Sequence, residues 1–258
     1  MGTYYDPLWV ATAFLGWRRG ASKKVAAIRA GLDSGMTLLD TAEIYGSEPL
    51  VAKAIEGRNR EDLFIATKVL PNHLHRDGFF KSLSRSLARL GVSYVDLYQI
   101  HWPNPRVPIS ETMGAMEELI GKGKVLNVGV SNFSLEQVVE ANAALKKSQI
   151  ASVQVSYSLI NRQPERNILP YCEKEGIALL AYYPLGHGKL VNNLKLEEFT
   201  NKYSKTQPQI ALNWLTSKRN VFPIPRASNR AHVAENAAAN GWRLDYSDLA
   251  KMETLFPS

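Results

Sequence analysis

The chain has a single cysteine, Cys172, and no long hydrophobic run. One cysteine excludes an internal disulfide and a multi-cysteine metal site, and the helical pattern around Cys172 favours a buried apolar role. No run approaches the ~18 apolar residues of a membrane-spanning helix. The apolar stretch 8–17 has its arginines after it, which is the wrong order for a signal peptide. These absences predict a soluble, cytoplasmic protein.

Clusters of one charge are missing as well. The formal net charge is +7, but the longest uninterrupted runs of Lys or Arg are pairs, at 18–19, 23–24 and 146–147. Such dispersed cations argue against a dedicated nucleic-acid site, which is the competing interpretation of a basic chain. A positive field over much of the surface still favours anionic ligands such as phosphorylated cofactors.

Linkers and low-complexity tracts are absent too, so we predict a single domain over residues 1–258. Short strand-like runs alternate about eight times with segments of helical period, which predicts an α/β fold of the (β/α)₈ TIM-barrel type. The expected strands are 8–12, 36–40, 63–67, 95–100, 125–130, 151–155, 177–182 and 221–224. The expected helices are 22–34, 47–56, 78–90, 110–121, 134–146, 164–175, 207–218 and 230–239, with a short one at 196–203 and a closing one at 244–256.

A doubly wound open sheet is the main alternative fold, but no G-x-G-x-x-G follows the first strand. Ser47, Ser110 and Ser134 stand where helix N-caps belong, and Ser134 with Gln137 fits a capping box. The connection 184–206 is the longest in the chain, and connections of this length usually carry function.

Four side chains of different chemistry stand at the C-terminal ends of the expected strands. Asp40, Lys68 and His101 each close a short apolar run, and Tyr45 comes five residues after Asp40. In a barrel these strand ends meet on the face that carries active sites. A carboxylate, a phenol, an ammonium and an imidazole together predict a proton-transfer site.

Acidity explains why these types belong together. A free tyrosine titrates near pH ~10 and is a poor proton donor at neutral pH. An ammonium at Lys68 held against the phenol of Tyr45 favours the phenolate and lowers its pKa, while Asp40 keeps the ammonium charged in a dry pocket. Taken singly, each residue could be a helix cap, a strand-end cation or a pocket wall; their joint placement favours catalysis.

Six segments resemble motifs of the aldo-keto reductases, in the order of that family and over nearly the whole chain. They are LLDTAEIYG (38–46), ATK (66–68), DLYQIHWP (96–103), NVGVSNF (127–133), AYYPLG (181–186) and IPRASNRAHVAEN (224–236). The resemblance implies a (β/α)₈ barrel that binds extended NADP(H) without a Rossmann fold and reduces carbonyls. It implies that Tyr45 protonates the carbonyl oxygen, that Lys68 and Asp40 tune this acid, and that His101 orients the substrate.

The resemblance also implies which residues contact the cofactor. Ser131, Asn132 and Gln154 match positions that bind the nicotinamide carboxamide, with a structural amide network as the alternative explanation. Tyr182 matches the aromatic that stacks on the nicotinamide ring, whereas Tyr183 replaces a serine common in the family. The cofactor-binding set comprises Thr12, Ser131, Asn132, Gln154, Tyr182, Leu185, His187, Arg226, Ser228, His232, Glu235 and Asn236.

At the adenosine end, Arg226 takes the place of a lysine that contacts the 2′-phosphate, and a planar guanidinium suits phosphate well. Glu235 and Asn236 match residues that hold the adenine, and His232 replaces an arginine common there. The resemblance therefore implies that NADP(H) is preferred, while NAD(H) stays possible.

The substrate side departs from the family. The Gly-x-Gly-Thr-Trp pattern is absent at 10–13, so we expect Trp102, Trp17 and Phe14 to form the substrate wall. Few residues follow the last expected helix before Ser258. We expect an open site that accepts aldehydes and reactive dicarbonyls broadly.

The sequence thus predicts a monomeric, NADP(H)-dependent oxidoreductase that acts on small carbonyl compounds. A regulatory or structural barrel with little turnover is a different class, and the complete set of four catalytic residues argues against it. A barrel hydrolase or isomerase needs paired carboxylates or metal ligands, and the spacing of Asp96 and Glu43 fits neither. No metal site is predicted.

Overall fold

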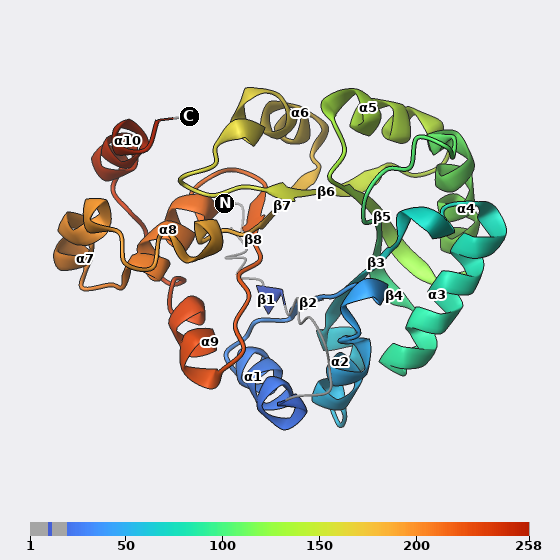
Figure 1. Cartoon of the computed structure of the whole chain (residues 1–258), viewed down its shortest axis with the longest axis horizontal. Coiled ribbons are helices and arrows are strands. Elements are labelled where there is room, and N and C mark those ends of the chain that lie inside the picture. The colour runs from blue at the N-terminus through green and yellow to red at the C-terminus, as the bar shows by residue number, and fades with distance from the viewer. Residues whose placement is uncertain (1–9, 12–19, 258) are drawn as a thin grey trace, which may run out of the picture.

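The computed structural model describes residues 10–11 and 20–257, and Figure 1 shows a curled sheet inside a ring of helices. Eight parallel strands form the sheet, and each pairs with the next along the chain, from β1 to β8. The strands are β1 (Val10–Ala11), β2 (Leu38–Asp40), β3 (Phe64–Val69), β4 (Val95–Ile100), β5 (Val125–Ser131), β6 (Ile150–Ser156), β7 (Ala178–Tyr182) and β8 (Val221–Pro223). Within the described residues no ladder joins β8 to β1.

Helices occupy the connections between the strands. They are α1 (Ala21–Asp33), α2 (Glu48–Ile55), α3 (Arg76–Leu90), α4 (Ile109–Gly121), α5 (Leu135–Ala144), α6 (Ile168–Glu175), α7 (Glu197–Tyr203), α8 (Gln207–Thr216), α9 (Arg230–Ala237) and α10 (Tyr246–Leu255). Short 3₁₀ turns, which the sequence did not predict, are η1 (Glu43–Tyr45), η2 (Arg60–Asp62), η3 (Pro71–His73), η4 (Gln163–Arg166), η5 (Gly186–Gly188) and η6 (Leu194–Leu196). Every helix in the described part of the chain is too short or too polar to cross a membrane.

The sequential strand order overturns the doubly wound alternative, in which the order reverses at a switch point. One helix prediction was wrong at its start. The expected helix 164–175 is split, because Asn167 leaves the helical region at φ −151° and its side chain accepts a hydrogen bond from the Ile168 N–H. The segment before Asn167 forms η4 instead.

The predicted caps had three different outcomes. Ser134 forms the expected capping box with Gln137 at the start of α5. Ser47 precedes α2 but caps nothing, because its hydroxyl is hydrogen-bonded to that of Thr41 at 2.8 Å. The prediction that Ser110 is an N-cap was wrong, since α4 already begins at Ile109 and the N-cap of this helix is Pro108.

Strands β5 and β6 approach each other closely at Gly129, where their register shifts. A Cβ built on this glycine would lie 2.2 Å from Ser152 Oγ and 2.8 Å from Ser152 O. Only glycine fits there without displacing backbone. This contact brings the two strand ends that carry Ser131 and Gln154 side by side.

Most of the core lies between the sheet and the helices, where Trp214, Phe79 and Phe199 are fully buried. A smaller cluster of Ala66, Leu97 and Leu180 belongs to the strands themselves. Cys172 on α6 is buried, as predicted, and burial raises the pKa of its thiol to about 12. The single cysteine is therefore a packing residue.

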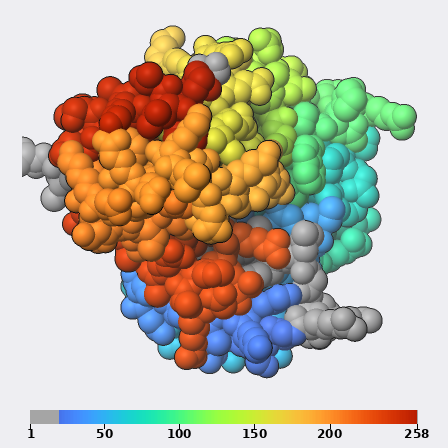
Figure 2. Space-filling view, turned by 60° about the vertical axis from the view of Figure 1, so that its left-hand side comes forward, coloured from blue at the N-terminus to red at the C-terminus, as the bar shows by residue number. Residues whose placement is uncertain are grey.

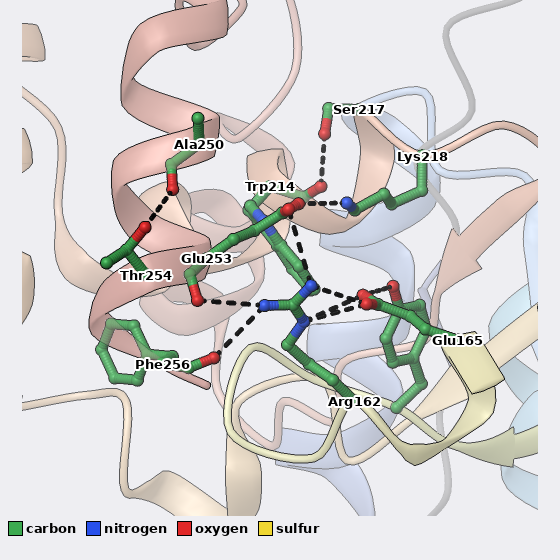
Figure 3. A network of polar contacts seen from close by, with 10 residues as sticks. Arg162, Glu165, Trp214, Ser217, Lys218, Ala250, Glu253, Thr254 and Phe256 are labelled. Carbon is green, nitrogen blue, oxygen red and sulfur yellow. Dashed lines mark hydrogen bonds and ion pairs between the residues drawn. The ribbon is translucent and has the colours of Figure 1, made fainter. Parts of the chain in front are cut away.

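The last helix, α10, is fixed to the connection after β6 by one arginine (Figure 3). Arg162 is paired with Glu165 at 2.6 Å and donates to the backbone oxygens of Glu253 and Phe256 at 3.2 and 3.3 Å. Its guanidinium also lies 5.6 Å from the ring of Trp214 on α8. Because only 11% of the Arg162 side chain is exposed, these bonds are made largely out of water.

Replacing Arg162 by Met should lower the free energy of unfolding by about 3 kcal/mol, since the change leaves the Glu165 carboxylate, which is only 20% exposed, without its cation. Urea titration followed by circular dichroism measures the loss. Arg166→Met, at an exposed position of the same turn, is the control and should cost less than about 0.5 kcal/mol. Equal stabilities of the two variants would contradict this role of Arg162.

Candidate active site

The four predicted catalytic residues meet at one edge of the sheet. Asp40 is the last residue of β2, Lys68 lies in β3, and His101 directly follows β4. Tyr45 ends the turn η1 after β2. Because β2, β3 and β4 are parallel neighbours, their C-terminal ends come together.

Lys68 and Asp40 form an ion pair that is sealed from solvent. Lys68 Nζ donates to Asp40 Oδ2 at 2.6 Å and to Thr41 O at 2.9 Å, and the two side chains are 0% and 2% exposed. Burial lowers the pKa of Lys68, and the Asp40 carboxylate opposes this shift. The carboxylate therefore supports the charged ammonium, as the sequence predicted.

Tyr45 lies between this pair and the imidazole. Its hydroxyl is 3.1 Å from His101 Nε2, and Lys68 Nζ is 5.2 Å from the centroid of its ring. The expected lowering of its pKa was wrong for the unliganded protein: burial, and then the charge of Asp40, raise the pKa of Tyr45. The reason is that half-burial of the phenol disfavours its anion. Tyr45 is consequently a neutral phenol at neutral pH.

His101 is buried and uncharged. Burial, and then the neighbouring Lys68 cation, lower its pKa to about 3. Its ring stacks on Trp102 with centroids 3.8 Å apart and meets the ring of Tyr45 edge-on. A neutral imidazole held in this way can form a hydrogen bond with an oxygen atom without adding a charge to the site.

A network of amides surrounds the ion pair. Asp40 Oδ1 accepts from Gln154 Nε2 at 3.0 Å and from Gln99 Nε2 at 3.5 Å. Asn132 donates to His101 O at 2.9 Å and accepts from the Tyr182 hydroxyl at 2.7 Å. The amide network, which the sequence left open as an alternative to cofactor binding, is therefore present.

A cavity of about 550 Å³ opens over these groups. The predicted site residues that line it are Asp40, Tyr45, His101, Trp102, Ser131, Asn132, Gln154, Tyr182, Leu185, His187, Arg226, His232, Glu235 and Asn236. Lys68 lies beneath its floor, and Ser228 is exposed and does not line it. The predicted Thr12, Phe14 and Trp17 fall outside the described residues.

Arg226 places a guanidinium in the lining of the cavity, which also includes the Glu235 carboxylate. Arg226 is exposed and makes no ion pair with the described part of the chain. His232 lies in the first turn of α9, where the Asn229 side chain accepts from its backbone N–H at 2.8 Å and contacts its Nδ1 at 3.2 Å. A guanidinium beside a helix N-terminus is a favourable place for an anion. In Figure 2 the segment after β7, in orange, and the segment around α9, in red-orange, lie next to each other on the side of the molecule that faces the viewer.

Comparison with known proteins identifies the family. A family model described as the aldo/keto reductase family matches residues 12–256. The chain belongs to the aldo/keto reductase family.

Individual relatives agree with this assignment. The methylglyoxal reductase YeaE of Escherichia coli is 36% identical over 243 residues, which are 91% of this chain and 85% of that protein. A thermostable aldo-keto reductase, solved in complex with the inhibitor epalrestat, shares 38% of its sequence and superposes with a TM-score of 0.91 over 96% of this chain and 94% of that one. An aldo-keto reductase from Klebsiella pneumoniae, solved with NADPH, is 33% identical, with a TM-score of 0.91 over 97% and 90% of the chains.

Some residues of this aldo-keto reductase that line the cavity were missed from the sequence. Ile44 precedes Tyr45 in η1 and Val191 lies in the long connection after β7, and each is an exposed apolar residue. Tyr183 lines the cavity beside His187, at 3.7 Å between rings, with φ 51° in the left-handed region. Val191 could have been predicted from the sequence, because the 184–206 connection that contains it is unusually long. No sequence feature predicted that Gln99 would contact Asp40.

The neutral state of His101 can be tested by titration. Because its pKa is lowered to about 3, the ring should not titrate between about pH 5 and 8, where an ordinary histidine does. The NMR resonances of this ring, assigned by their loss in His101→Gln, report it directly. The same variant should lower kcat about 10²-fold without changing the shape of the pH profile in that range. A ring titration near pH 6.5 would contradict the assignment.

Proposed function

We propose that this aldo-keto reductase uses NADPH to reduce aldehydes and dicarbonyl compounds to alcohols, with Tyr45 as the proton donor. The observation that carries the proposal is the convergence of Tyr45 Oη and His101 Nε2, 3.1 Å apart, above the buried pair of Lys68 and Asp40. Two hydrogen-bonding groups next to one cavity can hold one carbonyl oxygen. A sealed cation below them favours negative charge at that point.

The chain's own residues supply the acid and its stabilisation. Bound cofactor supplies the hydride. As charge develops on the carbonyl oxygen, Tyr45 transfers its proton to it. Because burial raises the pKa of Tyr45, this transfer requires that the phenolate left behind be stabilised. Lys68 stabilises the phenolate that remains, and neutral His101 donates a hydrogen bond to the same oxygen. Each well-placed donor contributes about 3 kcal/mol of transition-state stabilisation.

The chemistry of the cavity fits a phosphorylated dinucleotide. Arg226 and His232 supply cationic or donor groups at one end, beside the first turn of α9. At the other end Ser131, Asn132 and Gln154 supply hydroxyl and amide groups next to Tyr45. The NADPH bound to the Klebsiella relative supports the same choice. NADP(H) is therefore the preferred cofactor, and NAD(H) the weaker one.

The substrate side suits small carbonyls with little polar recognition. Ile44, Trp102 and Val191 expose apolar surface at the cavity, and each is at least 40% exposed. An apolar, open wall discriminates weakly, since one methylene is worth only about 1–3 kcal/mol. The methylglyoxal reductase of Escherichia coli, similar over 91% of the chain, supports dicarbonyls as substrates.

We further propose that the eight strands belong to a closed (β/α)₈ barrel. In this proposal the chain forms a single domain and acts as a cytoplasmic monomer.

A cofactor-binding regulatory barrel with little turnover is the second candidate. The assembled ion pair, phenol and imidazole argue against it, because binding alone requires no sealed lysine under a tyrosine. Absorbance at 340 nm with methylglyoxal and NADPH decides between the two. Tight NADPH binding without consumption would favour the regulatory role.

Tyr45→Phe should lower kcat about 10³-fold while the NADPH dissociation constant stays within about twofold, because only the transferable proton is removed. Stopped-flow consumption of NADPH and fluorescence titration measure the two quantities. Tyr246→Phe, at a residue that is 92% exposed, is the control for loss of a hydroxyl. Retention of more than a tenth of the activity in Tyr45→Phe would remove this residue from the mechanism.

Arg226→Ala should weaken NADPH about tenfold and NADH less than twofold, because only NADPH carries the 2′-phosphate that the guanidinium binds. Fluorescence titration with both cofactors gives the two constants. Arg230→Ala serves as the control, since Arg230 does not line the cavity and should change either constant less. Equal losses for both cofactors would refute the assignment of Arg226.

A further inference from the structure

Glu43 ties the turn that carries Tyr45 to the elements that follow β3. It is the first residue of η1, and only 8% of its side chain is exposed. Three donors from distant parts of the chain reach its carboxylate: the Leu70 backbone N–H, His73 Nδ1 at 3.1 Å and Ser82 Oγ at 2.6 Å. A buried carboxylate is tolerated only when its oxygens are bonded in this way.

The other side chains of η1 do not hold the turn in place. Ile44 is 49% exposed, and Tyr45 reaches into the cavity, where its hydroxyl meets His101. The N-cap residue Ala42 provides no side-chain cap, and Gly46 ends the turn in the left-handed region at φ 62°. The hydrogen bond of Ser47 braces only the residues that flank η1. Within the turn, Glu43 is thus the side chain that fixes the position of η1 relative to β3.

The bond to Leu70 bears on catalysis because Leu70 lies two residues beyond Lys68. Glu43 likewise lies two residues before Tyr45, so the bond links the phenol to the ammonium that must stabilise it. Lys68 Nζ is 5.2 Å from the Tyr45 ring centroid, and the attraction between the cation and a nascent phenolate falls with their separation. A turn free to move would weaken this attraction as the proton leaves.

We propose that Glu43 is a positioning residue for the reduction, which holds Tyr45 in register with Lys68 through its bond to the Leu70 N–H. The inference rests on the proposed function, because it concerns the proton that Tyr45 transfers. Glu43 does not line the cavity in which substrate and cofactor would bind. Its effect is therefore expected on proton transfer rather than on binding.

One pair of variants isolates the bond. Leu70→Pro removes the donor N–H, and the native φ of −74° already suits proline. Leu70→Ala is the matched control, because it removes side-chain atoms and keeps the N–H. The proline variant should lower kcat about tenfold relative to the alanine variant, with NADPH dissociation constants equal within about twofold.

A second pair changes the carboxylate itself. Glu43→Ala should lower kcat about tenfold, whereas Glu43→Gln, whose amide oxygen can still accept from Leu70, should keep at least about a third of the wild-type value. Glu117→Ala is the control for a general effect on stability, since Glu117 likewise bonds backbone N–H groups, those of Lys146, Lys147 and Ser148, away from the site. It should lower the melting temperature and leave kcat unchanged.

The solvent deuterium isotope effect on kcat separates positioning from mere destabilisation. It should rise in Glu43→Ala and Leu70→Pro, because a misplaced Tyr45 makes proton transfer slower relative to the other steps. Unchanged kcat in both, or a loss of kcat without a larger isotope effect, would overturn the proposal. Lack of turnover in the wild type would instead refute the proposed function, so the two failures are distinguishable.

Discussion

The ion pair of Lys68 and Asp40 is the interaction on which the rest of the site depends. Two opposite charges enclosed by protein are stable only together, since removing one partner of such a pair costs about 3–5 kcal/mol. Asp40 also receives the amide of Gln154, and Lys68 bonds the backbone after β2. The pair thus joins strands from both halves of the sheet, and the phenol, imidazole and amides are arranged above it.

Much of the fold and of the site could be predicted from the sequence, because both follow from strand ends. Apolar runs separated by helical periods predicted all eight strands to within two residues of the bounds that the structure describes. Parallel neighbours place the residues at their C-terminal ends together, so Asp40, Lys68 and His101 were predictable as a group. Tyr45 was predictable because its short spacing from Asp40 leaves it little room to move away.

What the sequence could not supply was the environment of each group. The pKa of Tyr45 depends on burial and on the charge of Asp40, which are properties of the packed structure. Gln99 lies within an apolar strand and becomes significant only because its amide reaches Asp40. Ser110 was taken for a cap although α4 begins before it, since a cap depends on backbone angles as well as residue type. Glu43 was visible as a carboxylate, but its three donors lie 27 to 39 residues away along the chain.

The burial of Cys172 gives the protein a chemical resistance suited to its proposed substrates. Reactive dicarbonyls are electrophiles that thiolates attack, and a thiol whose pKa is raised to about 12 is almost entirely protonated at neutral pH. The side chain is also enclosed between α6 and the sheet, where no dissolved aldehyde reaches it. An enzyme that meets such compounds at every turnover therefore presents them with no cysteine nucleophile of its own.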